Sequence, residues 1–384
     1  MSKRSALIAI CLMSVSVIAY SQQSQSGSND LKGSIDKLSQ DAAKQYVGPV
    51  VTGFGSDLNA GWFHRAPDAK VAQFDLEFGV VAMGTVFSDA NKTFSTSGQF
   101  QFTSDQAGSL VDQVNDPSYA SLPQPYKSQA RTQIINQIIA QSFTVGISGP
   151  TIIGSNKDSV KVGFQGRNFT FTDPQGGQHS VLVPSNNIGL PVTGLLGDKK
   201  ILGKNMVPLG APQLSIGTLF GTQFTFRYLP QYQISSEIGK TKYFGWGIQH
   251  NPAVWFPVEF PLDFSASFFS QKINAGTIFE AKTTSFGVNA SKRLGWGALN
   301  LTPYVGYMIE KSSMTFTYDY MLDVPVANGT GTVSTPQHIV FSMDGENKSR
   351  LTMGLSIKLL IVNVNADYNI GTYNSFSAGV MIII

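Results

Sequence analysis

The stretch QFTFRYLPQYQI, residues 223–234, alternates between apolar and polar side chains. Phe224, Phe226 and Tyr228 share one parity, whereas Arg227 shares the other with glutamines and a threonine. A repeat of two residues is that of a β-strand, whose successive side chains point to opposite faces. The stretch therefore predicts a strand with one apolar face and one polar face that carries Arg227.

The same alternation recurs from about residue 213 onward, in segments separated by turns rich in Gly, Asn and Pro. The clearest further segments are 260–268, 285–291, 299–310, 351–358 and 376–384. Earlier in the chain, a first strand is expected at residues 73–87 and a second near residues 94–102. Counting all the candidates predicts about fourteen strands.

The composition favours a membrane environment for these strands. Charged residues make up 13% of the chain, against the ~25% typical of a soluble globular domain, and aromatic residues make up 11%. Beyond the amino-terminal segment, no apolar stretch reaches the roughly 18 residues that indicate a transmembrane helix. Only helices and closed barrels satisfy the backbone in lipid, so a membrane form of this chain must be a closed barrel.

A secreted β-sandwich would show the same alternation and is the main alternative. The polar faces hold mainly Ser, Thr, Asn and Gln, as a wet lumen does, whereas a soluble sandwich usually presents more Lys and Glu to water. Aromatic residues such as Trp246, Trp255 and Tyr368 gather toward the segment ends, as in the girdles of membrane barrels. We therefore predict an all-β fold, a closed antiparallel transmembrane β-barrel.

The first residues have the features of a secretory signal peptide. Lys3 and Arg4 precede an apolar region at residues 6–18, and residues 19–21, Ala-Tyr-Ser, provide a cleavage signal. We expect residues 1–21 to be cleaved and the remaining chain to reach the outer membrane of a Gram-negative cell.

Charge and cysteine usage narrow the possible partners. Two of the 27 basic residues lie in the predicted signal peptide, which leaves 25 against 24 acidic residues and no dense basic run. A nucleic-acid partner is therefore not expected. The single cysteine, Cys11, lies in the same segment, so neither disulfides nor Cys-ligated zinc are expected afterwards.

Before the first strand, residues 22–63 are expected to form a helix and a hatch-like segment. Residues 30–46 have the pattern of an amphipathic helix, whereas residues 47–63 are too rich in glycine for a regular strand. Residues 64–384 are assigned to the barrel, with a helical insertion near residues 105–141 and a long excursion within residues 144–212. Helices between barrel strands must leave the wall, and we leave open whether they lie in the lumen or outside it.

The run from Tyr46 through Gly48-Pro49 to Phe63 resembles the amino-terminal signature of uncharacterised outer-membrane proteins of the Bacteroidetes and Chlorobi kind. Segments 226–230, 244–250, 365–368 and 377–379 are similar to later landmarks of the same proteins. That family is remotely similar to FadL-type long-chain fatty-acid transporters, and this resemblance implies a fourteen-stranded barrel occluded by an amino-terminal hatch. The chain departs from those transporters because it has no Asn-Pro-Ala motif near residues 57–63.

Two groups of residues are candidates for a functional site. Arg227, Asp75 and Glu77 lie on polar strand faces and are candidates for the lumen or for substrate binding, although ordinary structural ion pairs are the alternative. The gate candidates, on the resemblance, are Gly53, Phe54, Gly55, Asp57, Asn59, Trp62 and Phe63. The four histidines are scattered in turn-like surroundings and are expected to be solvated loop residues, so no catalytic residue, metal site or cofactor is predicted.

Three functions are compatible with this pattern. The first is passive transport of a hydrophobic or amphiphilic small molecule through a barrel in outer-membrane lipid, with the hatch as gate. The second is a structural or secretion-associated role in which the barrel holds a partner protein. The third, an embedded hydrolase, has the least support, because no nucleophile and base stand at a recognisable spacing. We therefore do not expect an enzyme, and the sequence does not define an oligomeric state.

Overall fold

The computed structural model describes residues 28–190, 192–194, 200–201, 204–235, 239–276, 279–296, 298–325 and 332–384. The chain divides into two compact units, Val47–Asn91 with Gly197–Ile384, and Met1–Tyr46 with Lys92–Leu196. The signal peptide predicted for residues 1–21 lies outside the described residues. Within the described part of the chain, no helix is long and apolar enough to cross a membrane.

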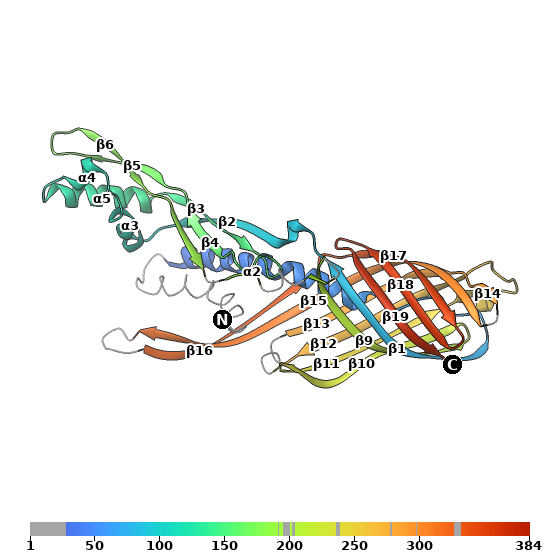
Figure 1. Cartoon of the computed structure of the whole chain (residues 1–384). Coiled ribbons are helices and arrows are strands. Elements are labelled where there is room, and N and C mark those ends of the chain that lie inside the picture. The colour runs from blue at the N-terminus through green and yellow to red at the C-terminus, as the bar shows by residue number, and fades with distance from the viewer. Residues whose placement is uncertain are drawn as a thin grey trace. The chain divides into compact units, whose positions relative to one another are not determined.

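The first unit is a closed antiparallel barrel (Figure 1). β1 pairs with β19 on one side and with β9 on the other, which closes the ring β1-β19-β18-β17-β15-β13-β12-β11-β10-β9. The ring strands are β1 (Ala72–Val86), β9 (Lys204–Leu219), β10 (Thr222–Ser235), β11 (Gly239–His250), β12 (Asp263–Ala275), β13 (Phe279–Ser291), β15 (Leu299–Pro325), β17 (Ser349–Leu359), β18 (Val362–Ile370) and β19 (Ser375–Ile383). Three further strands pair onto the ring, namely β8 (Lys200–Ile201), β14 (Leu294–Trp296) and β16 (Thr332–Asp344).

The ring has ten strands, so the predicted count of about fourteen is not confirmed. Some predicted wall segments lie outside the ring. These are residues 94–102 and the strands within 144–212 that precede residue 191, and they pair with one another in sheets that are separate from the barrel. Alternation is a property of any sheet with one covered face, so it does not distinguish a barrel strand from a strand of a neighbouring domain.

The predicted alternation agrees with the two faces of the barrel wall. On β13, Val288 is 60% exposed on the outside, whereas the neighbouring inward residue Ser285 is fully buried. On β10, Phe224, Phe226 and Tyr228 are exposed outward and Arg227 is buried inside. Polar side chains thus line the lumen, and apolar side chains cover the outer wall.

One long helix, α2 (Ser28–Asn59), precedes the barrel strands. It extends well past the end predicted at Tyr46 and contains Gly48, Pro49, Gly53 and Gly55. These residues weaken an isolated helix, but the helix beyond residue 46 belongs to the barrel unit, where packing supplies the missing stability. A Cβ at Gly53 would collide with the ring of Phe87, so this glycine also permits a close approach to the wall.

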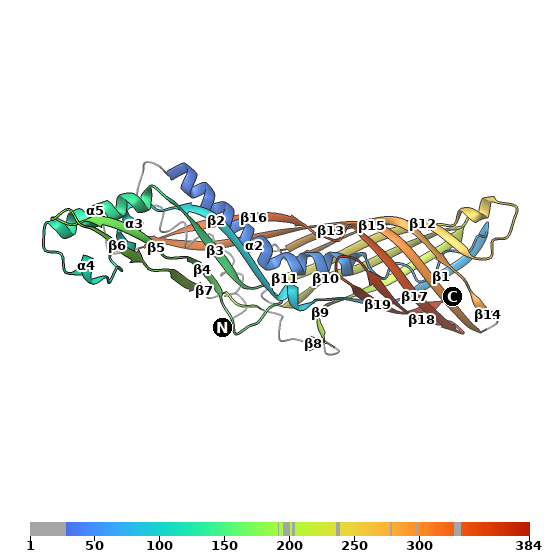
Figure 2. The same cartoon turned by 90° about the horizontal axis from the view of Figure 1, so that it is seen from above.

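Besides the first part of α2, the described residues of the second unit form two small sheets and three short helices (Figure 2). One sheet has the order β2 (Thr93–Gln101), β3 (Ser142–Pro150), β4 (Val160–Phe164), β7 (Asn186–Leu190), and the other pairs β5 (Arg167–Thr172) with β6 (Gln178–Val183). The helices α3 (Ser104–Val111), α4 (Pro117–Ala120) and α5 (Tyr126–Ile139) pack with the β5–β6 hairpin around Ile134, Phe143, Phe169 and Phe171. The unit therefore has a hydrophobic core of its own.

Candidate functional site

Residues 47–68, the last part of α2 and the loop after it, contact the inner wall of the barrel and are called the plug below. Every residue of the plug is buried or half-buried. Gly53 lies beside Thr85 near the end of β1, whereas Arg65 lies beside Asp75 near its start. The plug therefore runs along the lumen from one end of the barrel to the other.

At the first of these ends, the helix is held by hydrogen bonds to the wall. The Thr85 hydroxyl donates to the Gly53 carbonyl oxygen at 2.9 Å and to the Asp57 carboxylate at 2.8 Å. On the other side, the Phe54 ring meets the edge of Phe279 with 5.7 Å between the ring centroids. These contacts fix both the rotation and the depth of the helix.

In the middle of the lumen, two arginines bind the carboxyl end of α2. Arg227 on β10 donates to the Leu58 and Ala60 carbonyl oxygens at 3.3 and 2.9 Å, and Arg350 on β17 donates to the Asn59 carbonyl oxygen at 2.6 Å. The last carbonyls of a helix have no partner within the helix and carry partial negative charge. Two cations at this position therefore satisfy both the orphan acceptors and the helix dipole.

The two arginines differ in how their charges are balanced. Arg350 also forms an ion pair with Glu310 at 3.2 Å. Arg227 is fully buried, hydrogen-bonds to Gln213 and lies over the Trp62 ring at 4.1 Å from its centroid, and none of the described carboxylates forms an ion pair with it. The plug thus contributes two carbonyl acceptors and an aromatic face to the stabilisation of the Arg227 charge.

An aromatic layer follows the helix end. Trp62 and Phe63 stack against Phe269, with centroids 4.9 and 6.3 Å apart, and Phe63 meets the edge of Tyr304. The wall makes room for these rings with glycines: a Cβ at Gly245 would lie 2.9 Å from the Trp62 ring. These rings form one buried cluster with Met308 between the plug and the wall strands β12 and β15.

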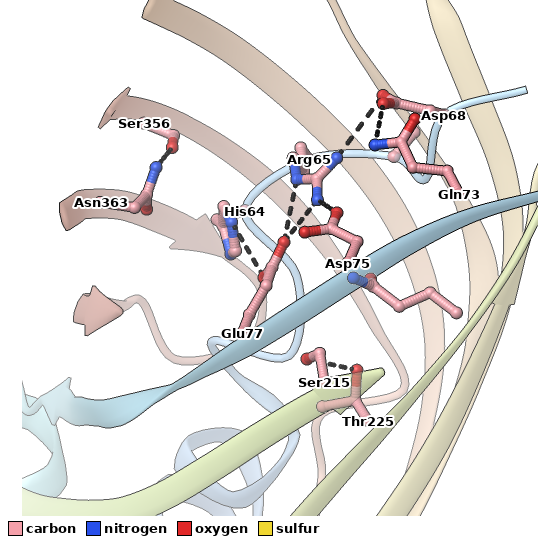
Figure 3. Close-up of polar contacts among 12 residues, drawn as sticks. His64, Arg65, Asp68, Gln73, Asp75, Glu77, Ser215, Thr225, Ser356 and Asn363 are labelled. Atoms are coloured by element: carbon pink, nitrogen blue, oxygen red, sulfur yellow. Dashed lines mark hydrogen bonds and ion pairs between the residues drawn. The ribbon is translucent and has the colours of Figure 1, made fainter. Parts of the chain in front are cut away.

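The far end of the plug is held by a buried ionic cluster, shown in Figure 3. Arg65 forms ion pairs with Asp75 and Glu77 of β1, and its Nε donates to Glu77 at 3.1 Å. His64 contacts the second Glu77 oxygen at 3.4 Å, and Asp68 lies 3.5 Å from Arg65. Buried charges are stable only when paired, so the cluster fixes this end of the plug to the first barrel strand.

Three further contacts hold the segment after Arg65 across the lumen. The Ala66 amide donates to the Ser291 hydroxyl at 2.9 Å, and the Asn251 side chain donates to the Pro67 carbonyl oxygen at 2.8 Å. Arg293 forms an ion pair with Asp68 at 2.7 Å. The plug is therefore bound to strands on several sides of the barrel at this end.

The structure places the predicted site residues along one lumen, from one end of the barrel to the other. Asp75, Glu77 and Arg227 point into the lumen, but each binds the plug instead of facing an open channel. The seven gate candidates all belong to the plug. The prediction for His64 is wrong, because this histidine is buried against Glu77 and is not a solvated loop residue.

Sequence reasoning missed Arg350, Arg65 and Gln271, which donates to the Leu58 carbonyl oxygen. Arg350 has the parity of the polar face of its strand, so the alternation contained its signal. Arg65 lies in an irregular segment, where no periodicity indicates the direction of a side chain. No cluster of three potential metal ligands occurs among the described residues.

Together, these features define a closed antiparallel β-barrel whose lumen is plugged by a helix from the same chain. The whole chain, residues 1–384, matches DUF6588, a family of unknown function, and the protein belongs to this family. No curated protein matches the chain.

Among solved structures, the chain is similar to OmpT, an outer membrane protein of Vibrio cholerae in its trimer form. The identity is 10% and the TM-score 0.21, over 81% of this chain and 99% of that one. It is also similar to a BenF-like porin from Pseudomonas fluorescens Pf-5, with 8% identity and a TM-score of 0.18 over 84% of this chain and 100% of the porin. TM-scores this low do not establish a shared architecture.

Proposed function

We propose that the protein is an outer-membrane barrel that passes a hydrophobic or amphiphilic small molecule when its plug is displaced. The proposal keeps the function expected from the sequence and from the resemblance to FadL-type transporters. The observation that carries it is the clamp of Arg227 and Arg350 on the carboxyl end of α2, because the plug is held by directional contacts that can be released without unfolding the wall.

The outer wall supports the location in lipid. Large apolar side chains are exposed outward on nine of the ten ring strands, and on β12 the outward Phe264 and Phe268 are half-exposed. Moving such a side chain from water into lipid is favourable by about 25 cal/mol for each Å² of apolar surface that leaves water. A closed ring also leaves no unpaired strand edge within lipid.

The lumen supports gating by the plug. The wall pairs many of its own polar side chains, as in Ser215 with Thr225 and Ser356 with Asn363 (Figure 3). Such pairs persist when the plug leaves. Arg227, Asp75 and Glu77, in contrast, would lose their partners in the plug and become available to a polar headgroup. An amphiphile with an apolar tail and a charged or polar head fits this combination of groups.

A reversible lock tests the proposal. Asp57→Cys with Thr85→Cys places two thiols where the native side chains touch, and a short thiol-reactive cross-linker then ties the plug to β1. The chain has one other cysteine, Cys11. Gln99→Cys with Thr144→Cys is the matched control, because these two side chains touch on neighbouring strands of the other unit.

The measurement is uptake of a fatty acid and of a sugar into liposomes that contain the protein. We expect the lumen lock to abolish fatty-acid uptake, reduction of a cleavable linker to restore it, and the control lock to leave it unchanged. Equal uptake with and without the lumen lock would contradict a moving plug. Equal uptake of the sugar would contradict the apolar substrate class.

A second candidate function has one specific observation in its favour. The insert between β1 and β9 folds around its own core of helices and hairpin, which is more structure than a connection between two strands needs. Such a unit suits a role in holding a partner protein. Replacing residues 94–190 with a short linker should then abolish partner capture while the barrel still folds, whereas transport of small molecules should continue.

A further inference from the structure

One end of the barrel, where β1 begins, has unusual turns and is called the turn end below. Its connections are Phe220-Gly221, residues 251–262, residues 292–298 and Leu360-Ile361. β14 and the carboxyl terminus also lie at this end (Figures 1 and 2). Turns that face water are normally polar and rich in Gly, Asn and Asp.

The turn end is apolar instead. Trp255 is 64% exposed and Leu360 is 67% exposed. The other exposed large apolar residues of this end are Val71, Leu219, Phe220, Phe256, Val258, Phe260, Leu262, Leu294, Leu299, Leu359, Ile361 and Ile384. Glu259 is the single acidic residue within 252–262. Exposed apolar surface of this extent indicates contact with something other than water.

Two of these turns keep apolar residues where the backbone disfavours them. Phe220 has φ +47° and Leu360 has φ +56°, and among the described residues they are the two with positive φ that are not glycine. Two-residue hairpins usually place Asn, Asp or Gly at such positions, because a Cβ is strained there. Retaining a large apolar side chain at both turns is understandable if the side chain has an apolar environment to enter.

The apolar surface of the turn end continues onto the outer wall. Phe220 stacks on Trp255 at 5.7 Å and 7° between ring planes. Phe256 meets Phe260 edge to face at 5.9 Å, and Phe260 meets Phe264 of β12 in the same way at 5.3 Å. A row of rings therefore connects the loop to the wall without an intervening polar belt.

Strand length supports the same position. The outward apolar residues of β17 run from Leu351 to Leu359, where the turn begins. Eight steps of about 3.4 Å, at a tilt of about 40°, span only ~21 Å along the barrel axis. The apolar band of membrane barrels is about 25 Å tall. The wall of β17 therefore spans the hydrocarbon only if the turn end is included.

The other boundary of the band is marked by charge. Lys272, Lys282 and Lys311 point outward from three adjacent strands, β12, β13 and β15, beyond the apolar residues, and Glu280 pairs with the first two at 2.6 and 2.8 Å. Such a row suits the level of lipid phosphates. Among the described residues of the turn end, no comparable row of outward charges on adjacent strands separates the band from the turns.

We propose that the turn end inserts into the lipid through its side chains, with those of Phe220, Trp255 and Leu360 among the acyl chains and the irregular backbone of residues 251–262 at the headgroup level. The proposal rests on the proposed outer-membrane location and specifies its depth. Lys70 and Lys292, which are exposed at the same end, have side chains long enough to reach the phosphate level, and Arg293 is paired with Asp68. A cargo that leaves the lumen at this end would enter lipid instead of water.

Spin labels on single cysteines test this depth in liposomes. Leu360→Cys reports the turn end, Val288→Cys reports the middle of the outer wall, and Gln175→Cys reports an exposed turn of the other unit. The readout is the relaxation of each label by oxygen, which concentrates in lipid, and by a water-soluble nickel complex. We expect Leu360→Cys to match Val288→Cys, with oxygen access several-fold above nickel access.

The outcomes separate two failures. If Val288→Cys behaves as a lipid-exposed site while Leu360→Cys behaves like Gln175→Cys, the turn end lies in water and the inference is wrong. If Val288→Cys also behaves like Gln175→Cys, the barrel is not in lipid and the proposed function fails first. Trp255→Cys repeats the test on a second connection of the same end.

Discussion

Arg227 and Arg350 stand on strands that are five positions apart in either direction around the ten-strand ring, and they bind neighbouring carbonyl oxygens of one helix end. A helix terminus held by cations from opposite walls is centred in the lumen. The end of α2 is therefore fixed at mid-height by both walls, and we infer that the plug closes the lumen there.

Removing the Arg227 clamp should loosen the plug. Arg227→Met keeps an unbranched side chain but loses two charged hydrogen bonds to the plug and the contact with Trp62, each worth about 1.5–3 kcal/mol. We expect a loss of about 3–5 kcal/mol of stability, measured by denaturant unfolding in micelles. Arg227→Lys should recover part of it, because a single ammonium cannot bind both carbonyls and Gln213.

Loss of the Arg65 ion pairs should loosen the end of the plug at residues 64–68. Arg65→Gln leaves Asp75 and Glu77 buried without a cation, so hydrogen exchange of the amides at residues 64–68 should become at least ten-fold faster. Arg293→Gln is the control, since Arg293 belongs to the same cluster but is 45% exposed. Unchanged exchange in Arg65→Gln would mean that this end of the plug does not depend on the ion pairs.

Gly245→Ala should displace the aromatic layer. The added methyl group would lie 2.9 Å from the Trp62 ring and 2.8 Å from the Gln271 side chain. Overpacking of this kind costs about 1–3 kcal/mol. Gly210→Ala is matched to it, because a Cβ at Gly210 of β9 meets nothing within 4 Å. In thermal unfolding followed by tryptophan fluorescence, Gly245→Ala should have a lower midpoint temperature than Gly210→Ala.

The β5–β6 hairpin should respond to acid. Hydrogen bonds from His179 and the Gly177 amide hold the pKa of Asp173 below its usual value. A carboxylate with a lowered pKa stabilises the folded turn above the unfolded pKa of ~3.9, and this contribution is lost as the pH falls through the folded value. The protection of the Gly177 amide, measured as the unstructured exchange rate divided by the observed rate at the same pH, should therefore fall below about pH 4, and Asp173→Asn should remove this dependence.

The barrel could be predicted from the sequence because alternation is local: Phe224, Arg227 and Val288 each lie on the face that their parity indicates. The strand count could not, because Phe94–Phe102 alternates equally well in a sheet outside the ring. Residues 47–59 were not predicted as helix, since Gly48-Pro49 disfavours one locally and the surrounding lumen determines the outcome.

The most direct test of the central claim is the conductance of a planar lipid bilayer containing the purified protein. A helix is about 10 Å across with its side chains, so deleting residues 30–63 should leave a lumen wide enough for water and ions. We expect the intact protein to show almost no conductance and the deletion variant to show stable unitary steps. Equal conductance for the two proteins, with both barrels folded, would contradict the claim that residues 47–63 of the plug close the lumen.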